Sequence, residues 1–291
     1  MLRRLFIFLF YCLFGLIIIG VCLILLFPND RFLSWAGDFI DSKNPGFACT
    51  IGDIRYVHPF KIRFYQVLIK NDHRQFELPI DSLLLAIEPR YPVDKVEVVG
   101  VLFGGHLSFD VNLEEKDQLD FENLTPSQMR LSDMTMLGRT IDRPIAGIIS
   151  FTGRAVTDRK NLSKVRFNGN VQIDNFSTQL RKPILNETQI NFDSIESDVT
   201  FSRNILDLSN GTASGPLLAG DFSGQINRWD PWQKSEIDIN GNLIPQPELL
   251  KKHPNLADPL RQLFQKYGRK SIPYIIDGTI TEPQFQFGNP N

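Results

Sequence analysis

The chain is 291 residues long, and its 31 Lys and Arg residues nearly balance its 33 Asp and Glu residues. Proteins that bind nucleic acid normally carry a clear basic excess, so this balance argues against a nucleic-acid partner. Hydrophobic residues make up 42% of the chain, which is enough to build a sizeable core.

The first predicted element is a membrane-spanning helix from Leu5 to Phe27 (residues 5–27), a stretch without any charged residue. A helix of that length reaches about 34 Å, enough to cross a bilayer core. The run is too long for the apolar part of an ordinary signal peptide, and no small-residue cleavage site follows it. Two arginines in the preceding stub (residues 1–4) predict a cytoplasmic amino terminus and a translocated carboxyl-terminal domain.

The cysteines help to choose a compartment for that domain. Cys12 and Cys22 fall within the predicted span, which leaves Cys49 alone outside it, so no disulfide can form within the domain. Extracellular eukaryotic domains usually carry disulfides. The chain does contain Asn-x-Ser/Thr sequons, but turns rich in Asn and Ser produce these by chance. We therefore expect a bacterial inner-membrane protein with a single span and a periplasmic domain.

Residues 28–45 predict a short amphipathic helix beside the membrane. Phe32, Trp35, Phe39 and Ile40 recur at helical spacing, which places them on one face. Trp35 would then lie at the membrane surface and add to the anchor. The alternative is that this helix caps the core of the following domain, and both arrangements would bury the same residues.

Residues 46–291 predict a β domain, because the apolar period changes from helical spacing to two. In the segment KIRFYQVLI the alternation slips once, between Phe64 and Val67. We expect amino-terminal strands over 46–113, a loop or insertion over 114–140, central strands over 141–244, a connector and a helix over 245–270, and carboxyl-terminal strands over 271–291.

The predicted helix near the carboxyl end rests on apolar residues at helical spacing between Leu256 and Tyr267, followed by Gly268 as a stop signal. The preceding segment IPQPELLKKHP contains three prolines and is typical of a connector. We expect this helix to plug one end of the sheet.

Glycine recurs inside the predicted strands. Such glycines mark bulges, sharp bends or close backbone approach, so their repetition predicts a long, strongly curved antiparallel sheet. The glycines expected to bend it are Gly105, Gly147, Gly169, Gly215, Gly220, Gly224, Gly241 and Gly278.

A sheet with one apolar face must cover that face with a second layer, a helix or a ligand. Two arrangements remain open from the sequence: a curled sandwich filled by its own phenylalanines, and a groove open to lipid. In both, the candidate inner-face residues are Phe167, Phe176, Phe192, Phe201, Phe222 and Phe285.

The glycine-rich stretch around Gly220 does not have the spacing of a phosphate-binding loop, and Asp221 would repel a phosphate there. Serines beside glycines lack the spacing of a nucleophile elbow. The four histidines are scattered without metal-ligand spacing. We therefore expect no enzyme activity, no cofactor and no metal site.

The carboxyl half resembles type II secretion system protein N (GspN). The resemblance rests on the block GPLLAGDFSG (215–224) with a later Gly-x-Leu-x-Pro (241–245), then a helix and IPYIIDGTITEPQFQF (272–287). HPFKIRFYQVLI (58–69) and VLFGGHLSF (101–109) extend it into the amino half.

This resemblance implies an inner-membrane component of the type II secretion apparatus, without catalytic residues. Such a component would act in assembly or stabilisation, by contacts with the inner-membrane platform or the secretin. The predicted architecture is also similar, at the level of the fold, to AsmA-like proteins. That likeness implies an alternative function, in which a curved sheet binds phospholipid along an apolar inner face.

Overall fold

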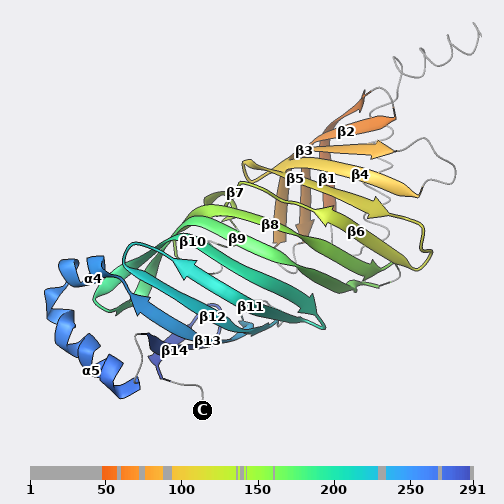
Figure 1. Ribbon diagram of the computed structural model, residues 1–291. Coiled ribbons are helices and arrows are strands. Elements are labelled where there is room, and N and C mark those ends of the chain that lie inside the picture. The colour runs from red at the N-terminus through yellow and green to blue at the C-terminus, as the bar shows by residue number, and fades with distance from the viewer. Residues whose placement is uncertain are drawn as a thin grey trace, which may run out of the picture.

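One open antiparallel sheet makes up most of the computed structural model (Figure 1). The structure describes residues 48–57, 60–71, 76–87, 94–135, 137, 141, 143–159, 161–228, 234–267 and 271–288. The prediction of a mainly β protein built on an antiparallel sheet is therefore confirmed.

The sheet has 15 strands, and along its main path each strand pairs with the next strand in the chain, except that β6 pairs with β8. Strand β7 lies off this path and pairs with β8. The first half comprises β1 (Ala48–Val57), β2 (Lys61–Asn71), β3 (Phe76–Ile87), β4 (Lys95–Leu102), β5 (Gly105–Asn112), β6 (Gln118–Leu124) and β7 (Met129–Arg130). The second half comprises β8 (Ile145–Asp158), β9 (Asn161–Ile184), β10 (Glu187–Ser202), β11 (Ile205–Ser214), β12 (Leu218–Asn227), β13 (Glu236–Pro245), β14 (Ile272–Gly278) and β15 (Pro283–Phe287).

The predicted membrane span over 5–27 and the amphipathic helix over 28–45, including Trp35, lie outside the described residues. Within the part that the structure describes, no helix combines the length and the apolar character needed to cross a bilayer.

Four polar residues inside strands adopt left-handed backbone conformations. Gln66, Asn123, Asn175 and Asn210 each have a φ of 51°. At each of them the alternation of side chains shifts by one position, and this returns the next apolar residue to the same face of the sheet. The slip between Phe64 and Val67 has this cause, because Gln66 lies between them and both apolar side chains are buried in one cluster.

The segment 114–140, predicted as a loop or insertion, contributes β6 and β7 to the sheet instead, followed by the short 3-10 helix η2 (Leu131–Asp133). In β6 the apolar side chains of Leu119 and Phe121 alternate with acidic ones. An acidic run in the sequence hides this alternation, although charged side chains on the solvated face of a strand are ordinary.

Two α-helices lie at the β14 end of the sheet, α4 (Pro247–Lys252) and α5 (Ala257–Tyr267), joined by the 3-10 helix η4 (Pro254–Leu256) (Figure 1). We call residues 247–267 the helical cap. The segment predicted as a connector thus forms α4, which begins with Pro247 at its first position. Proline is favoured there because that position needs no N–H donor within the helix.

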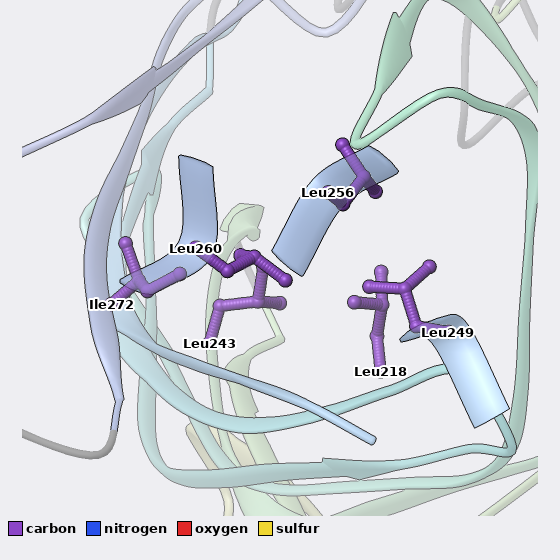
Figure 2. Packing of buried hydrophobic residues seen from close by; sticks show 6 residues of the cluster. All are labelled: Leu218, Leu243, Leu249, Leu256, Leu260 and Ile272. Carbon is purple, nitrogen blue, oxygen red and sulfur yellow. The ribbon is translucent and has the colours of Figure 1, made fainter. Parts of the chain in front are cut away.

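The helical cap packs on the sheet through leucines. Leu249, Leu256 and Leu260 from the cap and Leu218, Leu243 and Ile272 from β12, β13 and β14 form one buried cluster (Figure 2). Leu249 and Leu260 are 0% and 2% exposed. Burying a leucine contributes about 1.5–3 kcal/mol, so these contacts stabilise the packing of the cap on the sheet.

A second buried cluster lies at the opposite end of the sheet, on β1, β2 and β3. Its buried members are Ile54, Phe64, Val67 and Ile80, and of these Ile54 is 0% exposed. The two clusters place well-packed cores at the two ends of the sheet.

The eight glycines singled out from the sequence lie where another strand or loop comes close. A Cβ atom at each of them would come within 3.2 Å of a backbone atom outside its own chain neighbours; they are Gly105, Gly147, Gly169, Gly215, Gly220, Gly224, Gly241 and Gly278. At Gly105 the nearest atoms are the backbone of Ser127, Gln128 and Met129, so this glycine lets the segment before β7 pass beside β5.

Candidate functional site

One face of the sheet is apolar from end to end, and we call it the apolar face. In an antiparallel pair, directly opposed residues point to the same face. A line of opposed residues across the strands runs through Ile62, Leu85, Val98 and Phe109, then through Val111, Phe121, Ala155, Phe167, Phe201, Leu206, Ile226 and Ile237, and finally through Ile239, Ile276 and Phe285.

The opposite face is polar along the corresponding line. There the opposed residues are Arg154, Asn168, Thr200, Asp207, Gln225 and Asp238. Asp198 on this face accepts hydrogen bonds from the amides of Asn210 and Asn170, at 2.8 and 3.3 Å, and these lower its pKa. The polar face is therefore suited to water, and the two faces differ sharply in chemistry.

The register brings all six phenylalanines singled out from the sequence onto the apolar face. Phe167 lies opposite Phe201, and Phe176 lies opposite Phe192. Phe222 lies opposite Gly211 and Gly241 on its two neighbouring strands, and Phe285 ends the line described above. Phe192 differs from the others in position, because it packs against the cluster under the helical cap.

Sequence reasoning missed three aromatic residues of the same face. The rings of Phe109 and Phe121 have centroids 5.8 Å apart. Phe151 packs edge-on against Phe167, also with 5.8 Å between centroids. The alternation within LSFDV and IISFTG carries the signal for Phe109 and Phe151, whereas acidic neighbours obscure it for Phe121.

Between the two end clusters the apolar face is partly exposed. In β8, β9, β10 and β11, only Val199 is a buried hydrophobic residue among those that the structure describes. Phe151, Phe167 and Phe201 in these strands are partly exposed. We call the apolar face of β8–β11 the open stretch, since most of its apolar side chains are partly exposed.

Glycines on the apolar face let phenylalanine rings lie flat across it. A Cβ atom on Gly211 would approach two ring carbons of Phe222 to 2.5 Å. One on Gly153 would approach the ring of Phe167 to 2.8 Å. The rings of Phe222 and Phe167 therefore lie over neighbouring glycines instead of projecting from the sheet. The apolar surface is nearly flat at these two positions.

A buried carboxylate lies where the helical cap meets the sheet. The side chain of Glu187, at the start of β10, is only 9% exposed. Its two oxygens lie 2.8 and 2.9 Å from Nζ of Lys252, and its Oε1 lies 2.8 Å from Nε2 of His253. Burial raises the pKa of Glu187, but hydrogen bonds and charge from Lys252 and His253 outweigh burial and leave the pKa below its ordinary value. This carboxylate is therefore ionised and paired with the cap.

Tyr274 on β14 is a partly buried titratable residue at this end of the sheet, so its ionisation reports on the packing there. Its ring stacks on Phe285 with centroids 5.5 Å apart, and its hydroxyl donates to the carbonyl oxygen of Asp221 at 3.3 Å. Burial, together with the charge of Asp221, raises its pKa to about 12. The neutral phenol is therefore favoured by folding, which contributes stability that is complete below about pH 10 and is lost as the pH rises to about 12.

We expect Tyr274→Phe to remove this alkaline sensitivity. The difference in unfolding free energy between the unmodified protein and Tyr274→Phe should shrink between about pH 9 and about pH 11, because only the protein with tyrosine loses stability there. Urea unfolding at the two pH values measures it. An unchanged difference would show that Tyr274 is not buried in solution.

The described residues show no arrangement typical of an active site. No group of three or more His, Cys, Asp or Glu side chains among them could hold a metal ion. A hollow of about 390 Å³ lies around Glu122, Asn123, Thr152 and Arg154, where the polar face carries an ion pair between Arg154 and Asp120.

Comparison of the chain with models of protein families, with curated proteins and with solved structures finds no match. Function is therefore inferred from the chemistry of the sheet itself.

Proposed function

We propose that this protein binds the acyl chains of phospholipids along its apolar face, in the manner of the AsmA-like groove that the sequence suggests as an alternative. The observation that supports this most directly is the unbroken apolar line across the sheet together with its partial exposure in the open stretch. The protein is then a non-enzymatic lipid-binding component of the cell envelope.

The physical reason is the cost of hydrating an apolar surface. Removing apolar area from water stabilises a protein or a complex by about 25 cal/mol per Å². Monomeric soluble proteins rarely expose a contiguous apolar patch larger than a few hundred Å² unless it binds something. A surface of phenylalanine rings and glycines matches the chemistry of an acyl chain.

The source of the lipid follows from the position of the uncharged amino-terminal segment, which precedes the sheet in the sequence. The uncharged segment from Leu5 to Phe27 is long enough for a bilayer, and residues 28–47 separate it from β1. A membrane anchor at this position would keep the β1 end of the sheet close to the inner membrane. Phospholipid is then the apolar ligand present at highest local concentration.

A second candidate function is assembly of the type II secretion apparatus, and it rests on the resemblance to GspN. The open sheet favours it, because β1 and β15 end the strand order and are not joined to each other. Free strand edges bind other proteins by accepting a further strand. Loss of protein secretion on deletion, with unchanged membrane lipid composition, would support this role, and unaffected secretion would contradict it.

Photo-crosslinking in cells tests the lipid proposal. With p-benzoylphenylalanine at position 201, in the open stretch, we expect phospholipid adducts that mass spectrometry identifies. With the same probe at position 200, which points to the polar face on the same strand, we expect none. Adducts confined to this chain at position 201 would contradict lipid binding and indicate a closed core.

A further inference from the structure

We propose that the helical cap is a displaceable lid, held shut by Glu187, which covers the last part of the lipid-binding surface. This inference rests on the proposed function, since it concerns access to the same apolar face. Opening the lid would extend the open stretch from β11 to β14.

The topology permits the cap to move without disturbing the sheet. The cap is an insertion between β13 and β14, and these two strands pair directly with each other, with Leu243 opposite Ile272. The sheet is thus continuous beneath the cap. At its start the cap is tied by Gln246, whose N–H donates to the carbonyl of Leu217 at 2.9 Å, and at its end by Tyr267, whose hydroxyl lies 3.4 Å from the carbonyl of Phe287.

The cap lies on the same face that the lipid would use. Leu218, Leu243 and Ile272, which it buries, belong to the apolar face, because Leu218 and Leu243 continue the alternation of Phe222 and Ile239. Figure 2 shows the leucines of the cap pointing toward these strand residues. The cap therefore occupies this part of the face with leucine side chains, and acyl chains could replace them with little change in chemistry.

Glu187 forms the specific polar contacts between the sheet and the helical cap. Both hydrogen-bonding partners of this buried carboxylate, Lys252 and His253, come from the junction of α4 and η4. They lie 65 and 66 residues away from it in the chain, so this cluster forms only when the cap is closed. Apolar contacts would hold the cap in many registers, whereas hydrogen bonds to one carboxylate fix a single closed position.

The test compares the full-length protein with its Glu187→Gln variant in cells, using p-benzoylphenylalanine at position 274 beneath the cap. With Glu187 present we expect adducts to peptides of the cap. In Glu187→Gln we expect phospholipid adducts at this position to rise about tenfold, since a charge-assisted hydrogen bond is lost, and adducts to the cap to fall. Glu196→Gln, an exposed glutamate on β10, is the matched control and should change nothing.

A probe at position 201 separates this proposal from the proposed function. One outcome would overturn the lid and leave lipid binding intact. In that outcome the probe at position 201 gives lipid adducts in every variant, while the probe at position 274 gives only cap adducts in Glu187→Gln. Absence of lipid at 201 in the unmodified protein would overturn lipid binding itself. If Glu187→Gln misfolds, its adducts at position 201 will also be lost. The double variant Lys252→Gln/His253→Gln then replaces it, because it keeps the carboxylate of Glu187 and removes both hydrogen-bonding partners. The same rise in lipid adducts at position 274 is expected in the double variant, and its absence would overturn the lid.

Discussion

Phe222→Asp is expected to lower the amount of phospholipid recovered with the purified protein by about tenfold or more. Phe222 lies on the apolar face between Gly211 and Gly241, and it is not among the residues that pack against the helical cap. A carboxylate at this position would have to lose its water to let an acyl chain pass. Lipid extraction followed by mass spectrometry measures the effect.

Ser223→Asp is the matched control for Phe222→Asp. Ser223 is the next residue on β12, and it is exposed on the polar face, so an added carboxylate there stays in water. We expect lipid recovery to remain unchanged in this variant. Equal loss in both variants would show that charge alone disturbs the protein, and no loss in either would remove the apolar face of β12 from the lipid-binding surface.

Gly241→Ala is expected to cost about 2–3 kcal/mol of folding free energy, which lowers the Tm by about 5–10 °C. The added Cβ would overlap the carbonyl oxygen of Asp221 and lie 2.9 Å from the Cα of Phe222. Both are backbone atoms of the neighbouring strand, so relief requires β12 and β13 to move apart. Thermal unfolding followed by circular dichroism measures the change.

Gly100→Ala makes the same chemical change where there is room for it. A Cβ on Gly100 would lie 3.4 Å from the nearest atoms, a δ carbon of Leu83 and the carbonyl oxygen of Ser82. We expect its Tm to stay the same or to rise slightly, because alanine reduces the freedom of the unfolded chain. If Gly241→Ala behaved like Gly100→Ala, the close approach of β12 and β13 would not exist in solution.

The class of fold was predictable from the sequence because it depends on local alternation. Most strands have an apolar face and a polar face, and the pairing of successive strands keeps most apolar residues on one side. Phe167 and Phe201 could be assigned to one face before their pairing was known. The helix around Leu260 was equally predictable, since helical spacing and a stop glycine are local signals.

Other features depend on contacts that no local pattern contains. Glu187 meets Lys252 and His253 from 65 and 66 residues away, and a single glutamate near the start of a strand gives no sign of burial. The left-handed residues Asn175 and Asn210 look like ordinary polar strand positions. Their effect appears only as a slip in the alternation, which the sequence revealed at Gln66 and concealed elsewhere.

The order of the strands has a consequence for how such a protein changes in size. Because each strand on the main path pairs only with its neighbours in the chain, an inserted hairpin would lengthen the sheet without breaking any other pairing. Each added hairpin would extend the sheet by about 10 Å, two strand spacings, and would return the chain to the same edge. An architecture of this kind can grow or shrink by gene duplication in small steps, so that the length of the sheet can change during evolution without a new fold.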